Sequence, residues 1–328
     1  MSDINKDNFQ PLVSIIIPVF NGSNYLNEAI GSALNQDYKN IEVLVVNDGS
    51  DDGGQTESIA LAYGSRIRYF YKPNGGVASA LNLGISEMKG EYFSWLSHDD
   101  VYYPNKISAQ VKHIEALSDQ SEVIFSGFDI INGKGKKLNS VLPLKRYSIE
   151  QLETPLFALL HGMISGCSLL IHKSHFERVG IFCEDLATTQ DFDLWFRIMR
   201  NQPCRICESV LHKTRVHETQ GSRVYKDKHQ QEGDELWINI MEQLTESEKI
   251  QINGSVKKFY RNMYLLLLKY TTHHTAMCHA KSKSIESVGL RGTIARWWLE
   301  LYSAYILSRE MLSMIKRRVR RQSYRGVL

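Results

Sequence analysis

The strongest constraint on the fold is an alternation of short β-branched runs with helical stripes near the start of the chain. The run Val13–Val19 is rich in isoleucine and valine, which is typical of a strand buried on both faces of a parallel sheet. Further runs at 41–46, 67–71 and 92–96 predict three more strands. Apolar residues at helical spacing in 26–34 predict a connecting helix. This order predicts right-handed βαβ units, and hence a mostly parallel sheet with helices on its faces.

The composition is that of an ordinary globular protein. The chain has 328 residues, of which 43% are hydrophobic and 23% charged, and this length suits one large α/β domain plus a smaller region. Collagenous, low-complexity and wholly disordered chains are excluded. The start of the sequence is polar and the uncharged apolar stretches are shorter than a bilayer requires, so we expect a cytoplasmic protein without membrane-spanning helices.

The five cysteines carry no clear chemistry. An odd number in a chain with a polar start favours a reducing compartment. Cys204 and Cys207 form a C-x-x-C pair, but a zinc site needs four ligands and the chain has no second pair. Cys167, Cys183 and Cys278 are expected to pack in the core.

The middle of the chain predicts two local features. The segment NGKGKK at 132–137 is typical of a hairpin turn. Residues 149–160 predict a helix, which Pro155 is expected to break because proline lacks the backbone donor that a helix interior needs.

Polar and acidic residues follow three of the predicted strands, at Pro18–Asn21, Asn47–Ser50 and Ser97–Asp100. Ligands of open parallel sheets bind at the carboxyl ends of the strands. Carboxylates there repel phosphates unless a divalent cation lies between them, and oxygen ligands suit Mg²⁺ or Mn²⁺. These ends therefore predict a site for a cation-bridged diphosphate, where Asp48 accepts from a ribose hydroxyl or a base N–H and Gly49 leaves room for the nucleotide.

Two common nucleotide-binding motifs are absent. The chain contains neither the G-x-G-x-x-G of dinucleotide-binding domains nor the G-x-x-x-x-G-K-[ST] of P-loop proteins. Taken singly, an Asp-Gly-Ser turn is usually only a turn, and an aspartate pair before a helix is usually a cap.

The order and spacing of the strand ends resemble those of the family 2 glycosyltransferases, which are nucleotide-sugar-dependent enzymes with the GT-A fold. The resemblance covers residues 12–222 and includes Asn74–Gly76 with Asn82, and Gly90–Tyr92. It implies a mixed, mostly parallel α/β sheet flanked by helices, with a C-terminal helical extension. The nucleotide-binding residues that it implies are Pro18, Phe20, Asn21, Asp48, Gly49, Asn74, Gly76, Asn82 and His98.

In that family a D-x-D element holds a divalent metal on the diphosphate, and Ser97–Asp100 corresponds to it. This chain departs from the pattern, because Ser97 stands at the first acidic position. Asp99 is therefore the best match for the metal ligand. The resemblance implies Mn²⁺ or Mg²⁺ as the cofactor, with Asp99, Asp100 and His217 as candidate ligands.

The segment from Thr214 to Ser222 resembles the R-x-H-x-x-Q sequence that many members of the family carry after a late strand. This match implies that Arg215 and His217 lie near the diphosphate. Without it, a lone histidine is more often a hydrogen-bonded core or surface residue.

Residues 189–197 predict the start of a helix, with Asp191 and Asp193 in its first turn. Capping and compensation of the helix macrodipole alone account for most aspartates in such positions. The resemblance places the catalytic acidic segment of the family here, which implies that Asp191 is the base that takes the proton of the acceptor hydroxyl. Asp193 is expected to be a structural partner. Asp99 and Asp191 are expected to face one cleft.

The implied activity is that of an inverting glycosyltransferase, with a nucleotide-diphosphate sugar as donor, first of all a UDP-sugar. The acceptor is a hydroxyl of a sugar or of a lipid-linked molecule, in polysaccharide or glycolipid synthesis. Two alternatives stay open: a nucleotidyltransferase that makes activated sugars, and a non-catalytic module that binds a nucleotide sugar or a partner. No Gly-rich basic loop supports the first, and the altered D-x-D element is the only support for the second.

The sequence predicts a tail at 1–11, a glycosyltransferase domain at 12–232 and a helical, basic region at 233–328. The last region ends in a cluster of arginines and lysines at 316–325 that follows an aromatic and aliphatic segment. This pattern suits a peripheral helix on the anionic inner face of a membrane. A packed helix with a solvated basic end explains it equally well. No motif in it indicates nucleic-acid binding.

Overall fold

The structure is a computed structural model that describes residues 9–218, 220, 225–270 and 273–286. The chain divides into two units, residues 1–229 and 230–328; the sequence placed the domain boundary after residue 232. The basic cluster at 316–325 lies outside the described residues. Among the helices that are described, none is both long and apolar enough to cross a bilayer.

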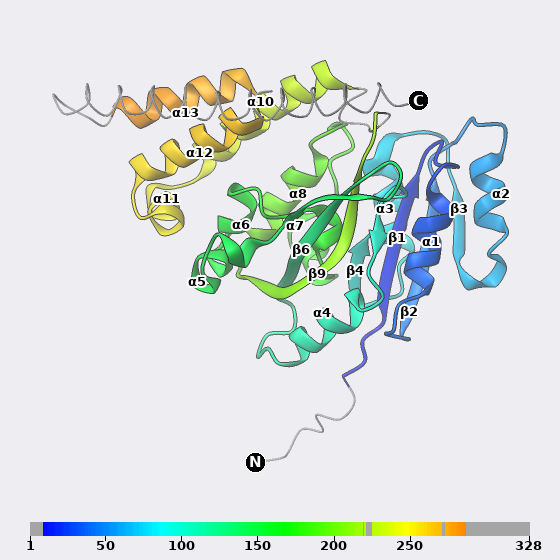
Figure 1. Cartoon of the computed structure of the whole chain (residues 1–328). Helices are drawn as coiled ribbons and strands as arrows, with labels where there is room; N and C mark the ends of the chain where they lie inside the picture. Colours follow the sequence, from blue (N-terminus) through cyan, green and yellow to red (C-terminus); the bar gives the residue numbers. More distant parts are fainter. Residues whose placement is uncertain (1–8, 219, 221–224, 271–272, 287–328) are drawn as a thin grey trace, which may run out of the picture. The chain divides into compact units, whose positions relative to one another are not determined.

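The first sheet has the strand order β3-β2-β1-β4-β8. Its strands are β1 (Val13–Val19), β2 (Ile41–Asn47), β3 (Arg68–Tyr71), β4 (Tyr92–Trp95) and β8 (Ile171–His172). β1 pairs in parallel with β2 and β4, β2 pairs in parallel with β3, and β8 is antiparallel to β4. The prediction of a mixed, mostly parallel α/β sheet is confirmed (Figure 1).

Three helices connect the parallel strands: α1 (Leu26–Leu34), α2 (Gln55–Leu61) and α3 (Gly76–Glu87). All of β1 is buried, as its sequence predicts. Ile15 and Ile17 pack with Leu26 and Ile30 of α1 in one core cluster. Ile16 points to the opposite face, toward α3. There Gly84 allows close packing, because a Cβ atom at this position would lie 2.4 Å from Cγ2 of Ile16.

The second sheet was not predicted. Its order is β5-β9-β6-β7, with β5 (Val101–Tyr102), β9 (Cys204–Val216), β6 (Val123–Asn132) and β7 (Lys137–Val141). β6 and β9 run side by side in parallel (Figure 1). β6 and β7 form the hairpin that the NGKGKK segment predicts. This sheet brings the end of β9 back beside the end of β4.

The remaining helices of the first unit surround these sheets. They are α4 (Lys106–Glu115), α5 (Ile149–Glu153), α6 (Phe157–Leu160), α7 (Ser174–Val179) and α8 (Gln190–Met199). The predicted break at Pro155 is confirmed, because it separates α5 from α6. Short 3-10 turns lie at 64–66, 143–145 and 166–168.

The described part of the second unit is helical, as predicted. It contains most of α10 (Lys226–Gln243), which begins before the boundary at residue 230, and α11 (Glu246–Asn253), α12 (Val256–Tyr270) and α13 (His274–Glu286). The Asp234 carboxylate accepts a hydrogen bond of 2.8 Å from the Ala276 backbone N–H, which ties α10 to α13. Thr245 and Glu248 form a capping box at the start of α11.

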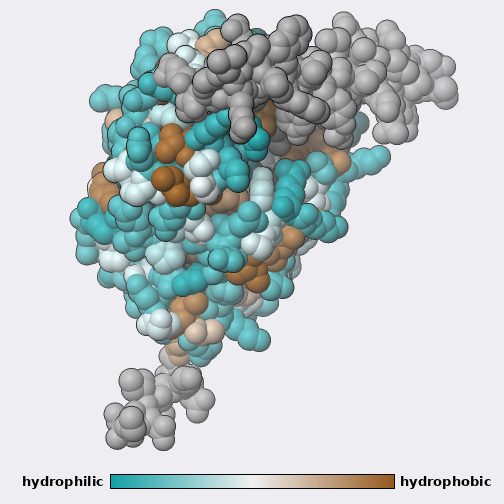
Figure 2. Space-filling view, turned by 90° about the vertical axis from the view of Figure 1, so that its left-hand side faces the viewer, coloured by the Kyte–Doolittle hydropathy of each residue, from teal (hydrophilic) through white to brown (hydrophobic). Residues whose placement is uncertain are grey.

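The cysteines only partly follow the prediction. Cys167, Cys204 and Cys207 are buried, whereas Cys183 is partly exposed and Cys278 is exposed. Core packing is therefore wrong for Cys278. On the face drawn in Figure 2, hydrophobic residues form separate small patches among hydrophilic ones.

Candidate active site

The loops after β1 and β2 are tied together at the carboxyl edge of the first sheet. The Asn21 amide donates to the Asp51 carboxylate at 2.6 Å, and the Asn21 backbone N–H donates to the Ser50 hydroxyl at 2.9 Å. Phe20 is 42% exposed, whereas Pro18 is buried within β1. Phe20 is thus an accessible aromatic surface at this edge.

Asp48 organises the loop between β3 and α3. Its carboxylate accepts hydrogen bonds from Lys72 Nζ at 2.7 Å and from the backbone N–H groups of Gly75 and Gly76 at 3.0 and 2.8 Å. The residue is only 3% exposed. Asp48 therefore holds the segment that contains Asn74, whose side chain is exposed. The sequence analysis did not identify Lys72, because its role depends on the contact with Asp48 that only the folded chain makes.

Position 49 needs a glycine because of the backbone conformation and close contacts there, more than because of a ligand. Its φ is +71°, and a Cβ atom would lie 2.5 Å from the backbone nitrogen of Asn74. The room that glycine provides is thus occupied by the chain itself, which corrects the expectation that it is left for the nucleotide.

We expect Gly49→Ala to lower the free energy of unfolding by about 2 kcal/mol, because it adds a backbone clash to a strained left-handed conformation. Urea unfolding measures this change. Gly53→Ala is the matched control: its φ is +69°, but no atom lies within 4 Å of the added Cβ. Equal losses in the two variants would show that the contact with Asn74 contributes nothing.

Asn82 joins α3 to a distant loop. Its amide nitrogen donates to the Phe182 carbonyl at 3.0 Å and to the Glu184 carboxylate at 2.9 Å, while its amide oxygen accepts from the Phe182 N–H at 3.0 Å. The side chain is 8% exposed. The expected nucleotide contact is therefore corrected: Asn82 fixes the segment that leads toward α8.

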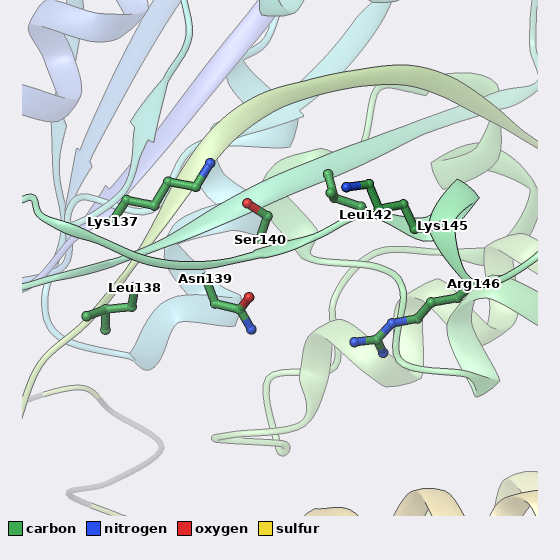
Figure 3. Close-up of a pocket in the computed structure, with 7 residues that line it drawn as sticks. All are labelled: Lys137, Leu138, Asn139, Ser140, Leu142, Lys145 and Arg146. Carbon is green, nitrogen blue, oxygen red and sulfur yellow. The ribbon is translucent and has the colours of Figure 1, made fainter. Parts of the chain in front are cut away.

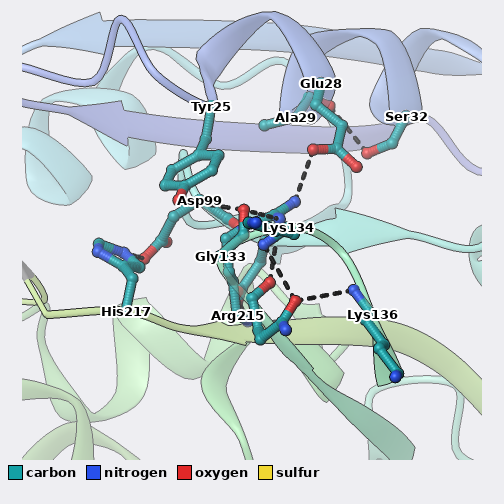
Figure 4. Close-up of polar contacts among 12 residues, drawn as sticks. Tyr25, Glu28, Ala29, Ser32, Asp99, Gly133, Lys134, Lys136, Arg215 and His217 are labelled. Carbon is teal, nitrogen blue, oxygen red and sulfur yellow. Dashed lines mark hydrogen bonds and ion pairs between the residues drawn. The ribbon is translucent and has the colours of Figure 1, made fainter. Parts of the chain in front are cut away.

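Asp99 and His217 meet, although 118 positions separate them in the sequence. Asp99 Oδ2 and His217 Nε2 are 2.8 Å apart, and each side chain is 11% exposed (Figure 4). Asp99 follows β4 and His217 follows β9, so the second sheet creates the pair. The Tyr25 ring packs beside the histidine, with ring centroids 5.3 Å apart.

The chemistry of this pair fits a divalent metal, because carboxylate oxygens suit Mn²⁺ and Mg²⁺ and an imidazole nitrogen is a common ligand of divalent transition metals. Across the described ranges, no group of three or more His, Cys, Asp or Glu side chains is placed to hold a metal ion. The protein thus offers two side-chain donors here, and further ligands would come from the substrate and water.

Asp100 points into the protein. Its carboxylate accepts a hydrogen bond of 2.8 Å from the Arg215 backbone N–H, and the residue is 5% exposed. Burial, and then the charge of neighbouring Asp99, raise its pKa well above the ordinary value. The structure therefore does not favour the expected role of Asp100 as a metal ligand.

Arg215 is a buried anchor between the two sheets. It is 1% exposed, and its guanidinium lies 4.4 Å from the centroid of the Tyr25 ring. Figure 4 shows its polar contacts. Its donors bond the Asp99 carbonyl (2.7 Å), the Asn132 and Gly133 carbonyls (3.4 and 3.3 Å) and the Glu28 carboxylate (2.6 Å).

These contacts correct the expectation that Arg215 binds the diphosphate. The guanidinium is engaged by protein groups, so Arg215 positions the Asp99 backbone instead. Gln220, the last residue of the R-x-H-x-x-Q segment, donates to the Arg215 carbonyl at 2.8 Å. The sequence analysis did not identify Glu28 of α1 or Tyr25 just before it, because no local pattern there indicates a partner from β9.

His98 lies beneath the loop after β1. A Cβ atom at Gly22 would be 2.6 Å from Cδ2 of His98, so the imidazole packs against the glycine backbone. Burial lowers the pKa of His98 below its ordinary value. A neutral ring is therefore favoured at this position.

Asp191 lies in the first turn of α8 and is partly exposed. Its carboxylate accepts a hydrogen bond of 2.9 Å from the Phe192 N–H. Burial raises the pKa of Asp191 to about 6, against the lowering effect of that hydrogen bond. A carboxyl group with such a pKa is a stronger base than an ordinary aspartate and is still ionised at neutral pH.

Asp193 pairs with Arg197 one turn later at 2.7 Å. The Arg197 guanidinium also donates to the carbonyl oxygens of Val179 and Ile181. Asp193 therefore has a structural partner in α8, which links the helix to the end of α7.

The stretches that carry Asp99 and Asp191 share an aromatic cluster. Phe182 packs against Trp95 and Trp195, with ring centroids 6.2 and 5.6 Å apart. Trp95 ends β4, and Trp195 lies one helical turn after Asp191 on the same face of α8. This cluster brings the start of α8 toward the end of β4. No sequence pattern indicates this cluster, because aromatic residues in a helix usually indicate only that the helix packs against a core.

The mostly parallel sheet, the acidic segment after β4 and the histidine that follows β9 are the features that the resemblance to GT-A glycosyltransferases implies. Residues 14–180 match the model of glycosyl transferase family 2, and the chain belongs to that family.

Relatives with glycosyltransferase names cover most of the chain. An uncharacterized glycosyltransferase of Rickettsia conorii is 50% identical over 268 residues, which are 82% of this chain and 44% of that protein. One from Rickettsia typhi is 48% identical over 266 residues, 81% of this chain and 83% of that protein. The Pasteurella multocida chondroitin synthase is 37% identical over 151 residues, 45% of this chain and 15% of that protein. The matched residues cover less than half the length of the Rickettsia conorii and Pasteurella multocida proteins.

Solved structures share the fold at low sequence identity. S. aureus TarS has a TM-score of 0.59 at 16% identity, covering 90% of this chain and 53% of that one. A mannosyltransferase from Pyrobaculum calidifontis, in complex with GDP-Man and Mn²⁺, has a TM-score of 0.57 at 17% identity, covering 93% and 87%. These similarities confirm the predicted GT-A fold.

Proposed function

We propose that the chain is an inverting glycosyltransferase that moves a sugar from a nucleotide-diphosphate sugar to an acceptor hydroxyl. The contact between Asp99 and His217 carries this proposal, because it builds a two-donor metal site at the edge where parallel sheets bind nucleotides. Membership in glycosyl transferase family 2 supports the same reaction class.

Different side chains have different roles in the proposed reaction. The Asp191 carboxylate accepts the proton of the acceptor hydroxyl as this hydroxyl attacks the anomeric carbon. Attack from the side opposite the leaving nucleotide inverts that carbon in one displacement. Asp48 and Phe20 contact the nucleoside in this proposal. The Asp48 carboxylate accepts three hydrogen bonds, which leaves about one acceptor site on Oδ2 for a ribose or base donor.

Asp99 and His217 would hold the divalent cofactor, which supplies positive charge for the developing charge of the diphosphate leaving group. The mannosyltransferase of similar fold, solved with Mn²⁺ and a nucleotide sugar, supports Mn²⁺ as the first metal to test.

The acceptor belongs to polysaccharide or glycolipid synthesis in this proposal. The similarity to the Pasteurella multocida chondroitin synthase supports a saccharide acceptor.

We also propose a cytoplasmic enzyme that contacts an anionic membrane through residues 316–325. Removing residues 316–328 should abolish co-sedimentation with anionic vesicles, and unchanged binding would contradict that contact.

The reaction is tested by incubating the protein with a panel of nucleotide sugars and Mn²⁺. We expect release of a nucleoside diphosphate. Release of inorganic pyrophosphate from nucleoside triphosphates and sugar 1-phosphates, assayed in parallel, would indicate a nucleotidyltransferase instead. The absence of both products would indicate a non-catalytic binding module.

We expect Asp99→Asn to raise the Mn²⁺ concentration needed for half-maximal activity by about 10- to 100-fold, because one of two protein donors is weakened. EDTA should abolish the wild-type activity, and added Mn²⁺ should restore it. Asp37→Asn, which changes an exposed carboxylate elsewhere in the domain, is the control. Full activity of the wild type in EDTA would contradict the metal assignment.

A further inference from the structure

A groove follows the edge strand of the second sheet. It has a volume of about 460 Å³ and is lined by residues of β7 together with Leu142, Lys145 and Arg146 (Figure 3). In the part of the chain that the structure describes, β7 pairs only with β6. Its other edge therefore presents backbone donors and acceptors to a ligand.

The charge of this region is opposite to that of the chain around it. Residues 130–149 contain five basic side chains and no acidic one, whereas residues 1–250 contain 24 basic and 33 acidic side chains. Lys137 is neutralised by Asp129 at 2.7 Å. Lys145 and Arg146 make no ion pair within the described residues, and both line the groove. Two cations are thus available to a ligand.

The groove begins beside the candidate active site. The turn that precedes β7 accepts hydrogen bonds at the Gly133 carbonyl from Arg215 (3.3 Å) and from the Tyr25 hydroxyl (3.3 Å). Figure 4 places Lys134 and Lys136 at this turn. From Lys137 to Val141 the strand extends roughly 14 Å away from the turn. A ligand along β7 therefore has one end near the Asp99 and His217 pair.

The lining suits a sugar chain better than a peptide. Leu138 is 57% exposed and offers an apolar surface for a sugar ring. Asn139 contributes an amide that can bond hydroxyl groups. The free cations lie beyond β7, at the end of the short turn at 143–145, so they do not alternate along the strand as contacts to an added acidic β-strand would.

We propose that this groove binds the acceptor, and that the acceptor is an extended saccharide that bears carboxylate or phosphate groups. The inference rests on the proposed glycosyl transfer, since it places the far part of the acceptor on Lys145 and Arg146 while its terminal hydroxyl reaches Asp191.

The test uses the full chain with Lys145→Gln and Arg146→Gln combined. Titration calorimetry at low ionic strength measures binding of oligogalacturonate, which carries carboxylates, and of a glycerol phosphate oligomer. A neutral maltooligosaccharide and a polyglutamate peptide are the comparison ligands. We expect the wild type to bind at least one anionic saccharide, and the double variant to bind it about tenfold more weakly, as the loss of two solvent-screened ion pairs predicts.

The matched control is Lys112→Gln with Lys173→Gln, which removes two exposed charges outside the groove and should leave binding unchanged. The preferred saccharide identifies the acidic group. Equal binding by wild type and double variant overturns the proposal, as does a wild type that binds no anionic saccharide or binds polyglutamate more tightly. Hydrolysis of the nucleotide sugar, in which water takes the place of the acceptor, is measured in parallel and should be unchanged in the double variant. A wild type that releases no nucleoside diphosphate either with water or with a saccharide acceptor would refute the transferase activity and not the groove.

Discussion

Asp191→Asn is expected to lower the rate of sugar transfer by about 10³-fold, the effect typical of removing a general base. Binding of the nucleotide sugar should change little, because the amide keeps the shape of the carboxylate. Calorimetry of donor binding and a steady-state transfer assay measure the two effects separately.

Asp193→Asn is the matched control. It removes a carboxylate from the same helical turn, but one that pairs with Arg197 in a partly exposed ion pair. Its loss should cost stability of only about 1 kcal/mol and leave most of the transfer rate. An Asp191→Asn variant that keeps most of its turnover would exclude Asp191 as the base.

The pH dependence provides a second check. Burial raises the pKa of Asp191 to about 6, so the rate limited by this base should fall as the pH drops below about 6. Because the pKa is raised on folding, protonated Asp191 stabilises the fold at acidic pH, and this contribution is lost as the pH rises through about 6. At neutral pH the free energy of unfolding of Asp191→Asn should therefore be no lower than that of the wild type. A loss of activity at neutral pH would then not result from unfolding.

Four strands of the first sheet follow from the sequence because each is a short local run of mostly apolar and aromatic residues, whereas β8 was not predicted. Val13–Val19 has no polar alternation, and the structure buries all of it. The helix with Asp191 in its first turn was predicted for the same reason, since its apolar residues recur at helical spacing. The short helix α2 was missed, because only Thr56 and Ala60 of its residues are buried.

The second sheet could not be predicted, because its pairing joins segments far apart in the chain. β6 lies beside β9 with register shifts near Gly127, and no local pattern encodes such a register.

The same dependence on contacts between distant segments explains the residues whose expected roles were corrected. Arg215, Asn82 and Asp100 match the family pattern by position, yet their polar groups bond protein partners that only the tertiary structure supplies.

The anchoring role of Arg215 leads to the second large effect. We expect Arg215→Met to lower the free energy of unfolding by about 3 kcal/mol, because methionine leaves buried carbonyl groups without their donor. The variant should also need about tenfold more Mn²⁺, since the Asp99 carbonyl loses the contact that positions the metal-binding segment. Urea unfolding and a Mn²⁺ titration of activity measure the two changes.

Two further variants distinguish the anchoring role of Arg215 from a role in which its side chain contacts the diphosphate directly. Glu28→Gln should cost less than about 1 kcal/mol, because the Glu28 side chain is 53% exposed. Arg215→Lys keeps the positive charge but loses the planar guanidinium group with its several N–H donors. Its free energy of unfolding should therefore lie between those of the wild type and Arg215→Met. If Arg215→Met instead kept its stability and Mn²⁺ requirement but lost affinity for nucleoside diphosphate, Arg215 would bind the leaving group, as the resemblance to the family implies.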